Sequence, residues 1–307
     1  MDKREHWFNE GAPLFRRALE QLGLADRLPT TEDRYYACPC CLIAYPFEAI
    51  ESQVLTIEHV PPDALGGKGM LLTCKRCNND AGRHFDAHAI KRAEVHNLLL
   101  GRQTNRPVRA VFLADGISVR GEVQSSGAGW FMQGVPRRND PAMLDAHERA
   151  LREASERGEA PQFNFELAER FSPQHADVSW IRSAYLAAFS ALGWRYILRP
   201  ALDPIRELLK SDSLPELPLV IGFNPTADSG SRSVMIVREP ENLSSVHVAI
   251  GQYSVFLPDP WGIMSLQELA ESISGMRNEE GGVSAMLSGQ LASWPKKPMY
   301  LLDRAIP

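Results

Sequence analysis

Two pairs of cysteines constrain the fold of this chain more than any other feature. The pairs are Cys38 with Cys41 and Cys74 with Cys77, and two residues separate the members of each pair. This spacing lets one tight turn present two sulfur atoms to a single ion, and four thiolates are a preferred structural site for Zn²⁺. We therefore predict that Cys38, Cys41, Cys74 and Cys77 bind a structural zinc ion. Such a site is closed, so the chemistry must lie elsewhere in the segment.

The fifth cysteine, Cys40, is left over, either as a buried free thiol or as a ligand in place of Cys41. All five cysteines lie before residue 78. The first residues lead into no apolar stretch, so we expect no secretory signal and a cytoplasmic location. In that reducing compartment clustered cysteines are metal ligands more often than disulfides.

Length and patterning predict an α+β fold. A chain of 307 residues that is 44% hydrophobic can bury a sufficient core, and it has no apolar run long enough for a membrane-spanning helix. Periodicity predicts helices over the first 34 residues, from about residue 79, over 141–158, 163–172 and 178–199, and after Ser265. Strands are predicted within 108–133 and near 217–223, 233–237, 246–250 and 254–257.

These patterns divide the chain into three parts. Residues 1–34 form an N-terminal helical segment, residues 35–100 a zinc-bearing domain, and residues 101–307 a C-terminal α+β region of unknown role. The zinc-bearing domain is thus inserted between the helical segment and the larger region.

The residues between and after the cysteine pairs carry a further pattern. Glu58-His59-Val60-Pro61-Pro62 follows an apolar stretch, a Gly66-Gly67 loop comes next, and Asn78 directly follows Cys77. Together with the cysteine pairs, this segment resembles the zinc-bearing branch of the HNH endonuclease family. The resemblance covers roughly residues 38–96, about a fifth of the chain. It implies a ββα-metal module, in which a two-stranded ribbon and a helix hold one divalent ion.

The resemblance also implies roles for three residues: His59 as general base, and Glu58 and Asn78 as ligands of the catalytic ion. The chemistry of these residue types agrees, because a neutral histidine is available near pH 7 to take a proton from water. A carboxylate and a carboxamide oxygen suit Mg²⁺ or Mn²⁺. An ion of this kind would neutralise charge on the leaving oxygen of a phosphodiester.

Two positions depart from the family pattern. Most members have Asp where this chain has Glu58, and Gly69 stands where the family has an asparagine that helps orient the base. Another group must then orient His59, or catalysis is weakened. On the following helix His84 and His88 are four residues apart, and two alternatives stay open for them: they line a polar face of the helix, as such pairs more often do, or they bind metal. For Asp86 we expect a role in helix packing or in supporting a metal ligand.

Local charge favours nucleic acid as the partner. The whole chain has a net charge of −5, but residues 60–109 carry nine basic and four acidic side chains, which leaves −10 for the remainder. A locally positive segment is what phosphate contact requires. Lys75 and Arg76, between Cys74 and Cys77, are the strongest candidates for nucleic-acid binding.

The sequence thus predicts a metal-dependent HNH endonuclease that hydrolyses DNA phosphodiester bonds, with DNA as partner and no membrane association. One alternative is a zinc-ribbon nucleic-acid-binding protein whose catalytic site has decayed. A second places the main activity in residues 160–307. The sequence leaves several properties open. They are the cleavage specificity, the choice between DNA and RNA as substrate, the physiological metal, the protein partners, self-association and the biological pathway.

Overall fold

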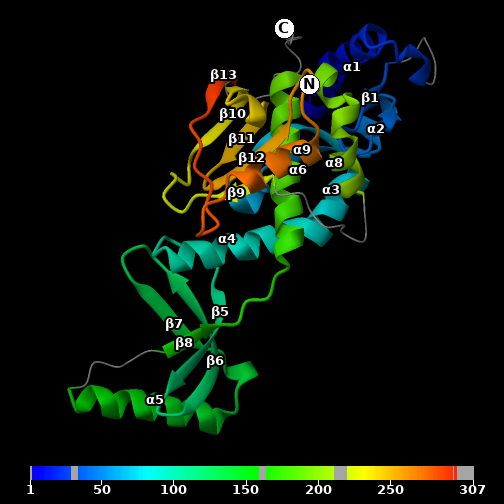
Figure 1. Ribbon diagram of the computed structural model, residues 1–307. Helices are drawn as coiled ribbons and strands as arrows, with labels where there is room; N and C mark the ends of the chain where they lie inside the picture. The colour runs from blue at the N-terminus through cyan, green and yellow to red at the C-terminus, as the bar shows by residue number, and fades with distance from the viewer. Residues whose placement is uncertain (1, 29–33, 159–163, 211–219, 293, 296–307) are drawn as a thin grey trace. The chain divides into compact units, whose positions relative to one another are not determined.

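The computed structural model describes residues 2–28, 34–158, 164–210, 220–292 and 294–295 (Figure 1). Both helices and sheets are present, which confirms the predicted α+β class. The backbone packs into two units, one made of Met1–Ala87 with Gln174–Pro307 and the other of His88–Pro173. The predicted division at residues 34 and 100 concerns the function of the segments and stays a prediction.

The N-terminal helix α1 (Lys3–Gln21) confirms the helix predicted from the spacing of apolar residues. The Asp2 side chain caps it by accepting a hydrogen bond from the Arg4 backbone N–H. Its apolar side chains are buried within the first unit, and they include Trp7, Phe8 and Phe15. The helix ends at Gln21, earlier than the predicted end near residue 28, and a 3-10 turn at Ala25–Arg27 follows. Residues 29–33 lie outside the described residues.

A run of short elements follows and positions the cysteines. Strands β1 (Tyr36–Ala37) and β2 (Ala44–Tyr45) form one ribbon, and after α2 (Glu48–Glu51) strands β3 (Leu55–Val60) and β4 (Lys68–Cys74) form another. Helix α3 (Lys75–Ala81) begins directly after β4, about four residues earlier than predicted. The reason is that Cys74 serves as its N-cap, with Sγ accepting from the Cys77 backbone N–H.

Helix α6 (Pro173–Leu192) forms the centre of the first unit, and nearly all of its side chains are buried. The single helix predicted over 178–199 is in fact α6 followed by α7 (Trp194–Ile197), because Gly193 interrupts it with a φ of 82°. Helix α8 (Asp203–Leu208) comes next. No helix in the described part of the chain has the length and apolar character that crossing a membrane requires.

A five-stranded antiparallel sheet completes the first unit, in the order β13-β10-β11-β12-β9. Its strands are β9 (Ile221–Phe223), β10 (Arg232–Glu239), β11 (Ser245–Ile250), β12 (Tyr253–Pro258) and β13 (Ser288–Ala292). One face packs toward α6, where the Trp180 ring stacks on Tyr253 with centroids 4.0 Å apart. Helix α9 (Leu266–Gly275) begins at the predicted place, because Ser265 and Glu268 form a capping box.

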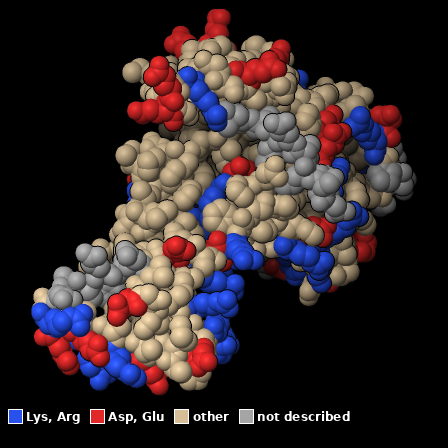
Figure 2. All heavy atoms as spheres, turned by 60° about the horizontal axis from the view of Figure 1, so that its bottom comes forward, with Lys and Arg blue, Asp and Glu red and all other residues tan. Residues whose placement is uncertain are grey.

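The second unit holds a four-stranded antiparallel sheet in the order β7-β6-β5-β8. Strands β5 (Val108–Ala114), β6 (Ile117–Ser125) and β7 (Trp130–Gly134) confirm the strands predicted within 108–133. The chain enters this unit through α4 (Ala87–Leu99). Helix α5 (Pro141–Glu156) confirms the charge-rich helix, and Figure 2 shows acidic and basic side chains interspersed along it at the lower left.

The helix predicted over 163–172 is wrong. Residues Asn164–Leu167 form strand β8, which pairs with β5 so that Phe165 lies opposite Phe112. Phe165 and Leu167 both pack against the core of this unit, as residues two apart on a strand do. Pairing with an existing sheet therefore outweighs the local helical tendency.

Candidate active site

The four predicted zinc ligands come together in the structure. The Sγ atoms of Cys38, Cys41, Cys74 and Cys77 all lie within 4.8 Å of one another. The first pair lies in the turn between β1 and β2, where the Cys38 N–H donates to the Ile43 carbonyl over 3.0 Å. The second pair spans the junction of β4 and α3. This donor set fits a structural zinc ion, which these four thiolates would hold.

Cys40 lies outside this cluster. Its side chain is buried, and the four gathered sulfur atoms include that of Cys41 instead. Of the two alternatives that the sequence left open, the structure favours Cys40 as a buried thiol. The Tyr185 hydroxyl of α6 donates to the Pro39 carbonyl over 2.7 Å, so the cysteine turn is anchored on the central helix.

Strands β3 and β4 with helix α3 form the ββα arrangement that the resemblance implies. The strands pair antiparallel from Leu55 opposite Cys74 to Val60 opposite Lys68, with a bulge between Glu58 and His59. A bulge re-aims neighbouring side chains. Consecutive residues of a strand face opposite sides, so Glu58 and His59 reach different surroundings.

His59 is exposed near the end of β3 and lies opposite Gly69. Among the described residues its ring has no hydrogen-bond partner. The structure explains the glycine: a Cβ at position 69 would lie 2.7 Å from Cγ2 of Ile57 and 3.9 Å from Nε2 of His59. An asparagine therefore does not fit there without a shift of Ile57, and no other described group takes over the orientation of His59.

Glu58 faces the interior of the first unit and is 3% exposed. Both of its carboxylate oxygens accept hydrogen bonds from Arg182 of α6, over 3.1 Å from Nη1 and 2.7 Å from Nη2. The Thr73 hydroxyl donates to Oε2 over 2.9 Å. Glu58 is therefore the counter-ion of a buried arginine.

The charges of this pair are linked. Burial raises the pKa of Glu58, while the neighbouring Arg182 guanidinium acts against that rise. Burial by itself would lower the pKa of Arg182, but the Glu58 carboxylate holds it well above its ordinary value. Because an arginine keeps its proton, the buried guanidinium requires an anion beside it.

Asn78 lies on α3 and reaches back to β3. Its Nδ2 donates to Thr56 Oγ1 over 3.2 Å and to the Ile57 carbonyl over 3.4 Å. These contacts fix the helix against the strand that carries Glu58 and His59. Asn78 is half-buried, and its two hydrogen bonds go to the part of β3 that directly precedes Glu58 and His59.

The predicted ligand set for a catalytic ion is not assembled in this arrangement. Glu58 is occupied by Arg182 and Thr73, whereas His59 is exposed. An ion at Glu58 would have to displace a guanidinium that is itself only 3% exposed. The three predicted residues are neighbours in the module, but the structure does not direct all their side chains at one open point.

The sequence did not identify Arg182 as part of this site. One signal was available, because a charged residue in the middle of a helix that is apolar on all sides needs a buried partner. The identity of that partner was not accessible, because Glu58 lies 124 positions away along the chain. Helix α6 also contacts Asp86, which was expected to have a packing role: Asp86 accepts a hydrogen bond over 2.6 Å from the hydroxyl of Ser179 on α6.

The other predicted residues have distinct surroundings. Lys75 and Arg76 are exposed at the start of α3, and Arg76 forms an ion pair with Asp80 at 3.7 Å. His84 lines a cavity of about 380 Å³ next to Cys41 and Cys77.

The basic residues of the 60–109 segment do not all reach the surface. The segment crosses from the first unit to the second, and Arg92 is buried in the second unit. There His88 also has a structural partner, because its Nδ1 accepts from the Ser172 backbone N–H over 2.9 Å. Lys75 and Arg76 are exposed, as are Lys68 and Arg83 of the same unit.

Comparison with known families agrees with this module. Residues 47–94 match the family model described as HNH endonuclease. The match includes β3, β4 and α3, and the four-cysteine cluster is consistent with the zinc-bearing branch. The resemblance seen in the sequence is thus confirmed over this segment, which indicates a nuclease-type function. No curated protein and no solved structure was found to match the chain.

Proposed function

We propose that this protein is an HNH endonuclease that hydrolyses phosphodiester bonds of DNA. One observation carries the proposal: the segment that matches the family folds as a ββα module beside a four-cysteine cluster, with His59 exposed on it. The position of His59 in the Glu-His-Val-x-Pro run is the one the family uses for its base.

His59 is the general base in this proposal. Its exposed imidazole takes a proton from a water molecule, and the water oxygen forms the new bond to phosphorus. The bond from phosphorus to the 3′ oxygen breaks, and that oxygen leaves and takes up a proton. Asn78 supports the base indirectly, because its side chain ties α3 to the backbone at Ile57.

The resemblance implies a divalent ion, Mg²⁺ or Mn²⁺, which when bound would neutralise charge on the leaving oxygen. We keep Glu58 and Asn78 as its proposed ligands. Since Glu58 is held by Arg182 in this structure, we assign no step of the reaction to the ion. Binding of an ion at Glu58 would require the carboxylate to exchange the guanidinium for the metal.

The proposed contact to DNA is made by Lys75 and Arg76. Both side chains are exposed at the beginning of α3, in the same turn of helix as Cys77 and Asn78. Backbone phosphates attract such side chains without regard to base sequence, so the contact would position the DNA rather than select a sequence.

A plasmid nicking assay tests the proposal. Supercoiled DNA is incubated with wild-type protein in Mg²⁺ or Mn²⁺, with the His59→Ala variant, and with His6→Ala as matched control, since His6 is exposed on α1. We expect nicking by the wild type and the control, and a loss of about 10²-fold or more in the His59 variant. Equal nicking by all three proteins would exclude His59 as the base.

The alternative function is a nucleic-acid-binding protein whose catalytic site has decayed. Two observations favour it: Glu58 is engaged in a buried ion pair, and Gly69 replaces the asparagine that would orient the base. This alternative predicts DNA binding by the wild type without metal-dependent nicking at any protein concentration. The same assay, combined with a binding measurement, therefore separates the two functions.

A further inference from the structure

A cavity of about 450 Å³ opens over the outer face of the five-stranded sheet. Its lining comes from β9, β11 and β12, from Ile273 on α9, and from residues 277–287. Small-molecule sites have volumes of roughly 300–1,000 Å³, so this cavity is of that size. None of its lining residues is among the residues assigned to the nuclease module.

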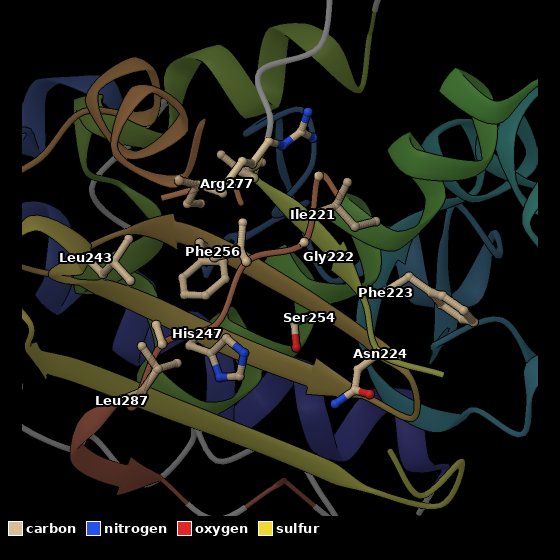
Figure 3. Close-up of a pocket in the computed structure, with 16 residues that line it drawn as sticks. Ile221, Gly222, Phe223, Asn224, Leu243, His247, Ser254, Phe256, Arg277 and Leu287 are labelled. Carbon is tan, nitrogen blue, oxygen red and sulfur yellow. The ribbon is translucent and has the colours of Figure 1, made fainter. Parts of the chain in front are cut away.

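The floor of the cavity is a patch of small and planar side chains. Strand register places Ser254 opposite Gly222 and Phe256 opposite His247, so all four lie on one face of the sheet. Figure 3 shows His247, Phe256 and Ser254 close together on adjacent strands. A Cβ at Gly222 would meet no atom within 4 Å, so the space above this glycine is empty. The floor thus has room for a flat group.

Polar atoms without protein partners face this space. In the part of the chain that the structure describes, neither the His247 ring nor the Ser254 hydroxyl forms a hydrogen bond. Burial lowers the pKa of His247 to about 4, so at neutral pH the ring offers one donor and one acceptor. Asn224 Oδ1 accepts from the Thr226 N–H and hydroxyl over 3.0 and 2.7 Å, which leaves the Asn224 amide nitrogen as a donor.

The rim adds one positive charge and apolar sides. Among the described residues of the lining, Arg277 is the single charged side chain, and it forms no ion pair with any residue that the structure describes. Figure 3 shows it at the opposite edge of the cavity from His247. The sides include Leu243, Ile273 and Leu287. A wholly apolar ligand would leave the floor groups unpaired, and a sugar alone would leave the aromatic and aliphatic sides without a matching surface.

We propose that this cavity binds a nucleoside monophosphate. The base lies against Phe256 and the aliphatic side walls of the cavity. The polar edge of the base faces Ser254, His247 and Asn224. The phosphate pairs with Arg277. A heterocyclic base has the mixture of donors and acceptors that the floor offers, and an arginine fits a phosphate through paired N–H groups. The site is separate from the nuclease chemistry and stands whether or not His59 catalyses cleavage.

The test uses adenosine, guanosine, cytidine and uridine 5′-monophosphates as probes with the full chain. We expect at least one of them to raise the thermal unfolding temperature saturably, and to do so equally in the His59→Ala variant. The Gly222→Leu variant fills the space above the floor without a steric conflict at Cβ and should lose the shift. The Arg277→Gln variant should bind the nucleotide at least tenfold more weakly but bind the free nucleoside as the wild type does.

Two outcomes overturn the proposal. One is the absence of a shift with all four nucleotides; the other is an equal shift in the wild type and in Gly222→Leu. If Gly222→Leu does not fold, the Arg277→Gln variant decides by equilibrium dialysis, because Arg277 lies at the rim and its side chain forms no ion pair with a described residue. Unchanged nucleotide affinity in that variant would also refute the proposal.

Discussion

Replacing Glu58 by glutamine should destabilise the first unit strongly, because Glu58 is the counter-ion of buried Arg182. The side chains of the pair are 3% and 4% exposed and are joined by two hydrogen bonds. Glutamine keeps the shape but removes the negative charge and turns an N–H group toward the guanidinium. Removal of one partner of such a pair costs about 3–5 kcal/mol. That is a large part of a typical stability of about 5–15 kcal/mol.

Urea unfolding followed by circular dichroism measures this effect, and Asp80→Asn is the matched control. Asp80 pairs with Arg76 on the same module at 3.7 Å, but both side chains are largely exposed, so the control should leave the unfolding midpoint unchanged. A double variant, Glu58→Leu with Arg182→Met, should recover most of the lost stability, because apolar replacement of a whole buried pair is often neutral. The reasoning is refuted if Glu58→Gln unfolds at the wild-type urea concentration, or if the double variant is less stable than either single variant.

Three further predictions concern other sites. Purified protein should contain one zinc ion per chain by elemental analysis. The Cys41→Ser variant should lose this ion and the Cys40→Ser variant should keep it. The reverse result would make Cys40 the ligand and Cys41 the free thiol. Burial holds the pKa of His247 at about 4, so the unfolded chain takes up its proton first as the pH falls from 6.5. Between pH 7 and pH 5 this costs about 2 kcal/mol of stability, and His247→Gln should remove that part of the difference between the two pH values in urea unfolding. Replacing Lys75 and Arg76 by alanine should weaken DNA binding uniformly across sequences and lower the salt dependence of the binding constant by about 2 units; an unchanged salt dependence would exclude both contacts.

Features encoded by neighbouring residues were accessible from the sequence. The cysteine spacing predicted the four-sulfur cluster, and the family resemblance of the residues between the pairs implied the β3-β4-α3 module. The capping residue Ser265 predicted the beginning of α9. Each cysteine pair and the Ser265 cap depend on turn or cap geometry within a few residues, which local sequence specifies directly.

Features that depend on tertiary partners were not accessible. Glu58 was assigned to an ion because its neighbour is a histidine, but the fold brings Arg182 against it from a distant helix. The segment at Phe165 was assigned to a helix and is a strand, because β5 offers it an edge to pair with. Gly69 was read as a missing side chain, whereas a Cβ at this position would lie 2.7 Å from Cγ2 of Ile57 and would require that side chain to shift.

Chemical rescue tests the central claim, that His59 is the base of a nuclease, most directly. The side chain is exposed, so its removal in His59→Ala leaves a space that solvent and a free imidazole can reach. Nicking of supercoiled plasmid is measured for this variant in Mg²⁺ or Mn²⁺ with and without added imidazole, while zinc content and circular dichroism verify the fold. The account predicts loss of nicking and its partial return in proportion to the imidazole concentration. Nicking by the variant at the wild-type rate without imidazole would contradict it.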